Sequence, residues 1–295
     1  MAEPPQVSIV VVNHNGGPLL QRCLERALAS TVAVEVILVD NASTDGSLAA
    51  ARRLPGVHCL ENRYNLGFAR AANQGLARAR APWRLLLNPD CLLEPDTLAR
   101  MLSELEGHPR VGMAGCRILD PDGREQRGCR RRLPDLGRGL AKALGKTRGA
   151  TAMDLHRQPL PEGPIEVEAI SGAFMLVRAE ALAQVGGLDE GYFLHCEDLD
   201  WCKGFQDAGW RILFVPQVEV VHHQGQCSQA KPLRVSWHKH RGMARYYRKH
   251  LAPHHPWPLR YLVLGAIGLR FVATLPRVLW RARRAAIFLP PPRAQ

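Results

Sequence analysis

Three carboxylates fall within four positions of this 295-residue chain, at Glu197, Asp198 and Asp200. An uncharged segment, residues 169–177, precedes them. Ionised carboxylates this close repel one another, so folding alone gives little reason to gather them. Such a cluster binds a cation, removes a proton from a hydroxyl within hydrogen-bond reach, or forms the acidic first turn of a helix. The residues of this segment alone leave the three roles open.

Another carboxylate, Asp40, directly follows the strand predicted at residues 34–39, with Asn41 and Asp45 close behind it. A carboxylate at the end of such a strand can accept hydrogen bonds from a nucleobase or a ribose. No GxGxxG motif accompanies it, which disfavours a nicotinamide or flavin site. A helix-capping loop is an equal alternative, because residues 41–46 are rich in capping side chains.

Asp90 ends the motif Asn88-Pro89-Asp90, and His222 follows a later predicted strand. Proline fixes the backbone beside Asp90 and so presents its carboxylate at the edge of the sheet. Mg²⁺ needs only one or two protein carboxylates when diphosphate oxygens and water supply its other ligands. His222 could add a ligand to that cation or bind a phosphate. A common turn and a surface histidine are the alternatives.

The elements that must position these side chains alternate between strand and helix through the first 116 residues. Apolar runs at residues 7–12, 34–39, 57–60 and 83–88 predict short strands, and apolar residues at helical spacing between them predict helices. Short, continuously apolar strands with helical crossovers predict an α/β fold, with a mainly parallel central sheet and helices on both faces. Ligands bind at the carboxyl ends of the strands in such sheets.

Regular patterning weakens after this point. Residues 117–164 have no clear period, so we predict a flexible insertion there. Patterning returns over residues 165–230, with a helix expected to begin near Glu197 and strands at residues 211–215 and 218–221.

The formal charge of +12 is concentrated in a C-terminal tail, residues 231–295, which we separate from a domain at residues 1–230. The tail holds 14 of the 39 Lys and Arg and none of the 27 acidic residues, which leaves 25 basic against 27 acidic residues in the domain. Nucleic acid could bind such a tail. Its apolar stretches, broken by Arg and accompanied by Trp and Tyr, fit an anionic membrane surface better.

The longest uncharged run of the tail, residues 261–269, is far shorter than the roughly 20 residues that a membrane-spanning helix needs. We therefore predict a basic amphipathic helical region that associates peripherally with a membrane. The alternative is a helical hairpin packed on the domain. No signal-peptide pattern begins the chain, and its eight cysteines form no CxxC pair, which favours reduced thiols in a cytosol.

Taken together and in order, the motifs resemble the family 2 glycosyltransferases, particularly their bacterial rhamnosyltransferase-like branch. The resemblance covers roughly residues 6–230. The segments that carry it are VSIVVVNHNG at residues 7–16, VDNASTDGS at 39–47, NLGFARAANQG at 65–75, LNPD at 87–90, SGAFMLVR at 171–178, GLDEGYF at 187–193, EDLDWC at 197–202 and VHHQG at 221–225.

The resemblance implies a GT-A fold, which is Rossmann-like, and an inverting transfer from a nucleoside-diphosphate sugar to a hydroxyl. Asp198 would be the general base that deprotonates the acceptor. Asp90 and His222 would hold a divalent cation, Mg²⁺ or Mn²⁺, or His222 would contact the diphosphate. The donor-binding residues would be Asn13, Asn15, Asp40, Asn41, Asn65, Gly67, Asn73, Asn88 and Asp90, and the acceptor-orienting residues would be Ser171, Gly172, Glu197, Asp200 and Trp201.

The resemblance also assigns residues 1–116 to a nucleotide-sugar-binding half and residues 165–230 to an acceptor-binding and catalytic half. The expected donor is dTDP-rhamnose, and the expected acceptor is a lipid-linked or cell-surface glycan. The expected location is the cytoplasmic face of the bacterial plasma membrane, with the tail on its anionic surface.

Two departures from the family pattern leave alternatives open. Lys203 and Gly204 stand where the family often has Arg, which leaves room for a non-catalytic glycan-assembly scaffold. Asn88 replaces the first acid of the Asp-x-Asp pattern, so the cation would have fewer protein ligands. A sugar nucleotidyltransferase is a further alternative, although the loop at residues 13–17 lacks the Lys or Arg that such enzymes place after the first strand.

Overall fold

The computed structural model describes residues 3–143, 152–223 and 232–288. Gln224 and Gly225 of the VHHQG motif lie outside these ranges. The cysteines within them are free thiols.

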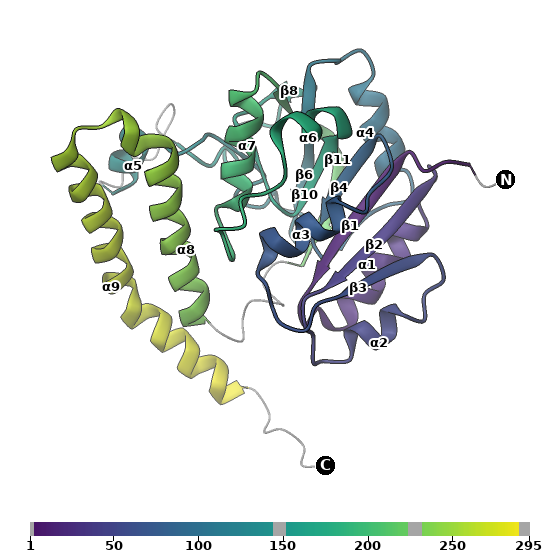
Figure 1. The fold of residues 1–295 in the computed structure, drawn as a ribbon, viewed down its shortest axis with the longest axis horizontal. Helices are drawn as coiled ribbons and strands as arrows, with labels where there is room; N and C mark the ends of the chain where they lie inside the picture. The colour runs from purple at the N-terminus through teal and green to yellow at the C-terminus, as the bar shows by residue number, and fades with distance from the viewer. Residues whose placement is uncertain (1–2, 144–151, 224–231, 289–295) are drawn as a thin grey trace.

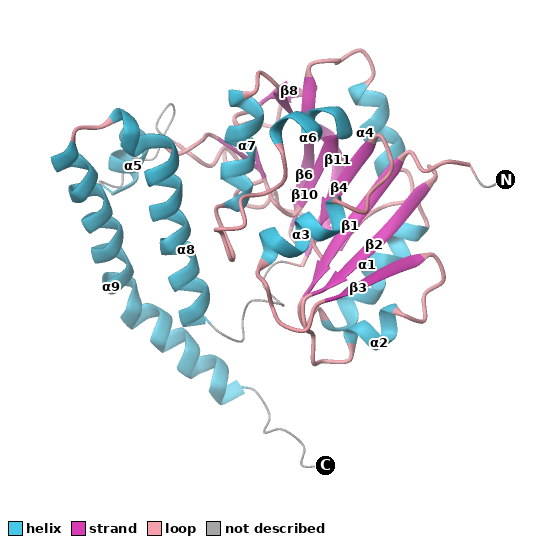
Figure 2. Ribbon diagram, in the orientation of Figure 1, coloured by secondary structure: helices cyan, strands magenta, loops and turns pink. Residues whose placement is uncertain are grey.

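The centre of the molecule is a nine-stranded sheet in the order β3-β2-β1-β4-β10-β6-β11-β5, with β8 paired to β11 (Figure 2). Its first four members in this order are parallel neighbours, namely β3 (Val57–Glu61), β2 (Val34–Asp40), β1 (Val7–Asn13) and β4 (Trp83–Leu87). These strands match the four predicted apolar runs.

The remaining strands extend the sheet on the other side of β4. β10 (Phe174–Arg178) lies antiparallel between β4 and β6 (Val111–Leu119), and β6 is parallel to β11 (Arg211–His222). β5 (Cys91–Leu92) and β8 (Ile165–Glu166) are short antiparallel neighbours of β11. The prediction of an α/β fold with a mainly parallel central sheet is confirmed.

Helices cover both faces of the sheet, as predicted (Figure 1). One face carries α1 (Gly17–Leu28), α2 (Ser47–Ala51) and α4 (Thr97–Leu105), and the other carries α3 (Phe68–Leu76), α6 (Ala179–Val185) and α7 (Glu197–Asp207). Because both faces are covered, all seven residues of β1 are buried.

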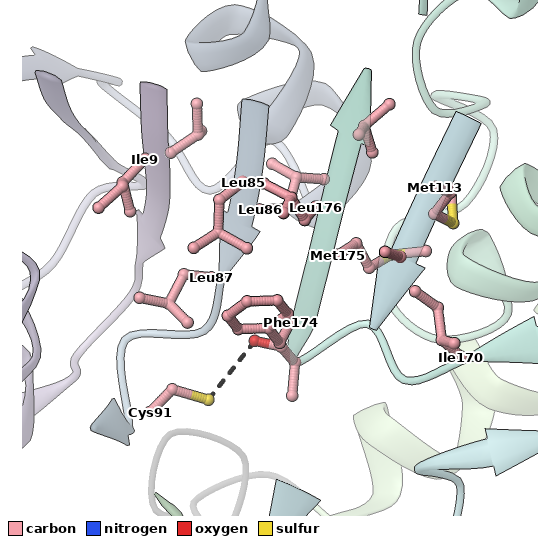
Figure 3. Packing of buried hydrophobic residues seen from close by; sticks show 14 of the residues in the cluster. Ile9, Leu85, Leu86, Leu87, Cys91, Met113, Ile170, Phe174, Met175 and Leu176 are labelled. Carbon is pink, nitrogen blue, oxygen red and sulfur yellow. Dashed lines mark hydrogen bonds between the residues drawn. The ribbon is translucent and has the colours of Figure 1, made fainter. Parts of the chain in front are cut away.

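The core lies where β4 and β10 meet. Figure 3 shows the leucines of β4 beside Phe174 and Leu176 of β10, and Leu85, Phe174 and Leu176 have no exposed surface. Helix α3 packs so closely against β1 that a Cβ on Gly75 would lie 2.3 Å from Val10 Cγ1. This packing fixes the strand ends that carry the predicted site.

Two sequence boundaries differ from the structure. The insertion predicted from residue 117 begins inside β6, and it contains β7 (Arg130–Arg131), which pairs with β9 (Ala169–Ile170), and helix α5 (Leu136–Ala143). The two strands predicted at residues 211–221 are the single strand β11, with an irregular register between Val215 and Glu219. Pro216 lies at this irregularity. Proline has no backbone N–H, so it interrupts the hydrogen bonding between β11 and its neighbour.

The C-terminal region is a helical hairpin beside the domain (Figure 1). It contains α8 (Pro232–Tyr246), a π-helical turn η2 (Tyr247–Leu251), a 3₁₀ turn η3 (Ala252–His254) and the long helix α9 (Trp257–Phe288). By length and composition alone, Trp257–Trp280 could cross a membrane, with a mean hydropathy of 1.7 and no buried share. The apolar segment is therefore longer than the uncharged run at residues 261–269, because it continues past Arg270.

Candidate functional site

The predicted site residues gather at the carboxyl ends of the strands. Asn13 ends β1 and Asp40 ends β2, and the two are paired in register. Asp90 follows β4, and His222 ends β11. The topology thus brings together motifs that are separated by up to about two hundred residues.

The loop after β2 is organised by buried side chains. The Asp40 carboxylate accepts hydrogen bonds from Asn13 Nδ2 at 2.8 Å and from the Ser43 amide at 2.9 Å. Both Asn13 and Asp40 are almost completely buried. Asn15, in a left-handed conformation with φ 58°, accepts from the Thr44 amide at 2.7 Å. Asp40 therefore orders the loop that the sequence assigned to the nucleotide.

Asn41 connects this loop to the start of α3. Its Nδ2 donates to Asn65 Oδ1 and to the Gly67 carbonyl, both at 3.1 Å, and its Oδ1 accepts from the Leu66 amide at 2.9 Å. Gly67 has φ 87°, and a Cβ there would lie 2.8 Å from the Phe193 carbonyl oxygen. Only glycine fits this close approach.

Two predicted site residues, Asn73 and Trp201, form hydrogen bonds within the fold. Asn73, predicted to bind the donor, exchanges two 2.9 Å hydrogen bonds with the backbone of Leu188 and so fastens α3 to the segment before α7. Trp201, predicted to orient the acceptor, is 2% exposed, donates to the Gly186 carbonyl at 2.9 Å and packs edge-on against Phe205. Both side chains are thus engaged inside the fold, and their roles toward donor and acceptor stay predictions.

Asp90 and His222 are both buried and lie side by side. His222 Nε2 lies 3.0 Å from Asp90 Oδ1 and 3.3 Å from Asn88 Nδ2. Cys91 Sγ lies within 4.8 Å of the ligand atoms of both residues. However, the Cys91 thiol donates to the Ala173 carbonyl, and burial followed by the charge of Asp90 raises its pKa well above the ordinary value. The residues present therefore fit a divalent cation held by Asp90 and His222.

Asp198 lies in the first turn of α7 with both carboxylate oxygens engaged. Arg131 Nη2 donates to its Oδ2, and the Leu199 amide donates to its Oδ1 at 2.9 Å. Burial raises the pKa of Asp198, but the charge and hydrogen bond of Arg131 outweigh burial, so the pKa lies below its ordinary value. Gly172 passes close by, since a Cβ there would lie 3.3 Å from Asp198 Cβ. Ser171 closes the preceding turn by accepting from the Ala173 amide at 3.2 Å.

Glu197 differs from its neighbour. Its side chain is buried, and its Oε2 has no hydrogen-bond partner within residues 3–143, 152–223 and 232–288. Burial and then the charge of Asp198 raise its pKa to about 8. Burial thus favours the protonated form of Glu197, whereas Arg131 favours the ionised form of Asp198.

Asp200 contacts the C-terminal region, and its role toward the acceptor stays a prediction. Lys249 Nζ donates to Oδ2 at 2.7 Å, while His250 Nε2 at 2.7 Å and the Tyr192 hydroxyl at 3.1 Å contact Oδ1. Lys249 also reaches Asp189 at 3.1 Å. These charged contacts join η2 to α7 and to the segment before it.

The sequence did not predict which residues contact Asp198, His222 and Asp200. Arg131 belongs to a run of three arginines whose basic charge could have indicated an acidic partner. Gln126, which contacts His222, has no such signal. Lys249 and His250 were assigned to a membrane-facing tail. Each lies more than 45 residues from the residue it contacts.

Comparisons with known proteins agree with this architecture. Residues 8–186 match the family model described as "Glycosyl transferase family 2". The chain is 34% identical over 303 residues to the N-acetylglucosaminyl-diphospho-decaprenol L-rhamnosyltransferase of Mycobacterium tuberculosis, covering 95% of this chain and 96% of that protein. It is 24% identical to Rhamnosyltransferase WbbL of Escherichia coli, over 79% of this chain and 89% of that one.

A solved structure shares the fold. The mannosyltransferase PcManGT from Pyrobaculum calidifontis, in complex with GDP-Man and Mn²⁺, superposes with a TM-score of 0.58 at 22% identity. The match covers 98% of this chain and 77% of that protein.

The neutral form of Glu197 makes a prediction about stability. Because its folded pKa of about 8 exceeds the ordinary value of 4.5, its contribution to stability is complete below pH 4.5 and is lost as the pH rises through 8. The free energy of unfolding should fall by about 1.4 kcal/mol per pH unit between these values. Replacing Glu197→Gln should remove this dependence, so the variant should have the higher thermal midpoint at pH 8.5.

The measurement is calorimetric unfolding between pH 5 and 9. The matched control is Glu180→Gln, which alters an exposed glutamate on α6. Parallel stability curves for wild type and Glu197→Gln would show that Glu197 is ionised in the folded protein.

Proposed function

The chain belongs to glycosyl transferase family 2, and from this premise we propose that it transfers L-rhamnose from a nucleoside-diphosphate donor to a lipid-linked diphospho-glycan. The observation that carries the proposal is the 34% identity to the mycobacterial rhamnosyltransferase over 95% of this chain. The family makes the chain a glycosyltransferase. The donor sugar and the acceptor are the part that we propose.

Asp198 is the proposed general base. Its low pKa keeps it ionised, and each carboxylate oxygen retains a lone pair beyond its hydrogen bond to Arg131 or to the Leu199 amide. The acceptor hydroxyl gives its proton to Asp198 as its oxygen bonds to the anomeric carbon. The bond to the diphosphate breaks from the opposite face, so the configuration at that carbon inverts. Held on two sides, the carboxylate keeps one orientation for this step.

The donor is proposed to lie over the loop that Asp40 and Asn41 organise, with its diphosphate near Asp90. Asp90 and His222 would hold Mg²⁺ or Mn²⁺ in this arrangement. When bound, such a cation offsets the charge on the leaving diphosphate. Asn88, 3.3 Å from His222, lies at the same place.

Helix α9 is proposed to attach the enzyme to the cytoplasmic face of the plasma membrane, where a lipid-linked acceptor would be reached. Its apolar side chains Trp257, Tyr261, Leu262 and Leu269 are about 70% exposed. Exposed apolar surface of this extent is typical of a membrane or partner interface. The aromatic residues near its start suit the boundary between water and lipid.

The proposal is tested by transfer. Purified protein with dTDP-rhamnose, Mn²⁺ and an N-acetylglucosaminyl-diphospho-lipid should form a rhamnosylated lipid, detected by mass spectrometry. Asp198→Asn should lower kcat by at least about 100-fold, since general-base catalysis contributes 10²–10⁴-fold, and should leave donor binding measured by thermal shift nearly unchanged. Glu180→Gln serves as the matched control.

Two outcomes would count against the proposal. Wild type that turns over other nucleotide sugars but not dTDP-rhamnose would refute the donor assignment. Full activity of Asp198→Asn would remove Asp198 from the base role, and wild type without donor binding would favour the glycan-assembly scaffold.

Arg131 should set the pH dependence of transfer. The Arg131 guanidinium lowers the pKa of Asp198, and loss of an opposite charge raises a carboxyl pKa by about 1–3 units. In Arg131→Met, the acid limb of kcat/KM against pH should therefore move to higher pH by a similar amount. Arg131→Lys should retain most of the wild-type profile.

Arg127→Met is the control, because Arg127 lies in the same segment but pairs with Asp154 at the surface. A profile of Arg131→Met that coincides with wild type would mean that Asp198 is not the titrating base.

Truncation separates membrane attachment from folding. A chain ending at residue 256 lacks α9 but keeps Lys249 and His250, so it should leave the membrane fraction and still fold, with a modest loss of thermal midpoint because Phe271 no longer packs on Trp237. A chain ending at residue 231 also loses the contacts to Asp200 and should unfold at a clearly lower temperature. Membrane association of the 256 variant equal to wild type would contradict the role of α9.

A further inference from the structure

Gln126 forms hydrogen bonds with both the backbone and the ring of His222. Gln126 Nε2 donates to the His222 carbonyl at 2.6 Å, and His222 Nδ1 lies 2.8 Å from Gln126 Oε1. Both residues are at least nine-tenths buried. The two residues are 96 positions apart in the chain, so the contact is a feature of the fold rather than of a local turn.

This pair of hydrogen bonds determines where the imidazole proton lies. The His222 carbonyl can only accept, so the amide nitrogen of Gln126 must face it and the amide oxygen must face Nδ1. An amide oxygen can only accept, so Nδ1 carries the hydrogen. Neutral His222 is therefore left with a lone pair on Nε2, the atom that lies 3.0 Å from Asp90 Oδ1.

In the neutral form of the imidazole, which is the form that binds a cation, the lone pair on Nε2 faces the Asp90 oxygen. Two electron-rich atoms at this distance repel unless a positive charge lies between or beside them. Asn88 Nδ2, 3.3 Å from Nε2, offsets the repulsion only in part. This arrangement suits a cation with one nitrogen and one oxygen ligand from the protein.

The backbone around Gln126 is fixed as firmly as its side chain. The Gln126 amide donates to the Ile118 carbonyl at 2.8 Å, directly beyond a turn closed by the Asp120 amide and the Arg124 carbonyl at 2.9 Å. Ile118 belongs to β6, which pairs in parallel with β11, the strand that ends at His222. The Gln126 backbone is thus bonded to β6, the strand beside the one that ends at His222.

We propose that Gln126 is a positioning residue of the cation site, which fixes the tautomer and the ring orientation of His222 so that Nε2 is presented to the cation beside Asp90. This inference rests on the cation site of the proposed function. Partners that orient a metal-binding histidine typically contribute 10–100-fold to metal affinity. The segment containing Gln126, which the sequence predicted as a flexible insertion, then takes part in the donor site.

The test measures Mn²⁺ binding directly, from the electron paramagnetic resonance signal of the unbound ion, with and without dTDP. Gln126→Met keeps the length of the side chain but removes both hydrogen bonds, and it should weaken Mn²⁺ binding by about 10–100-fold. Gln184→Met is the matched control. Gln184 lies on α6, accepts a hydrogen bond from Trp210, and is not one of the residues proposed for the cation site. Asp90→Asn identifies binding at the proposed cation site.

A second measurement needs no variant. Nitrogen-15 spectra of the wild-type histidine rings, assigned with His222→Gln, should show His222 in the form protonated at Nδ1. In Gln126→Met the same ring should become a mixture of both tautomers.

The outcomes separate this inference from the proposed function. Wild-type affinity in Gln126→Met, or a wild-type His222 ring protonated at Nε2, would overturn the role of Gln126 and leave the glycosyltransferase assignment intact. Mn²⁺ binding that is absent from wild type, or unaffected by Asp90→Asn, would overturn the cation site itself and the role of Gln126 with it.

Discussion

The turn that begins α7 is the constraint on which the candidate site depends. His195 and Cys196 are consecutive non-glycine residues in left-handed conformations, with φ 69° and 73°. Such residues cost of order 1–3 kcal/mol each and persist only where the surroundings determine them. Helix α8 supplies these surroundings, because Gly242 packs so closely that a Cβ there would lie 2.7 Å from the His195 carbonyl oxygen. The direction in which Asp198 enters the site therefore depends on a helix that follows the domain in sequence.

The cluster of three carboxylates is stable because each has a different environment. Asp198 is paired with Arg131 from β7, and Asp200 is paired with Lys249 and His250 from η2. Among the residues that the structure describes, Glu197 forms no salt bridge, and its raised pKa favours the neutral form, which lessens its repulsion with Asp198. Repulsion within the segment is thus relieved from opposite sides of α7. The pKa of Asp198 is lowered, as the proposed base role requires, Asp200 pairs with the C-terminal region, and the pKa of Glu197 is raised.

The sequence predicted those features of the fold that a local pattern of residues determines. The four parallel strands from β1 to β4 are apolar runs, and Asp40 and Asp90 follow them directly, so their place at the sheet edge could be predicted. Partners across the fold could not, because the spacing of a motif does not say which atom a side chain meets. Asn73 belongs to a motif typical of the family, yet it binds the backbone of Leu188. Motif membership therefore indicates that a residue matters, without separating chemical from structural roles.

Part of the positive charge of the C-terminal region is paired with acidic residues of the domain. Arg245 and Lys249 pair with Asp189 and Asp200 of the domain, so these cations stabilise the fold and are not available to a membrane surface. The attachment that we propose therefore rests on the apolar surface of α9 more than on net charge. Phe271 of α9 packs against Trp237 of α8, and α8 in turn supports the turn before α7. A membrane that holds α9 would consequently also fix how Asp198 is oriented toward a lipid-linked acceptor.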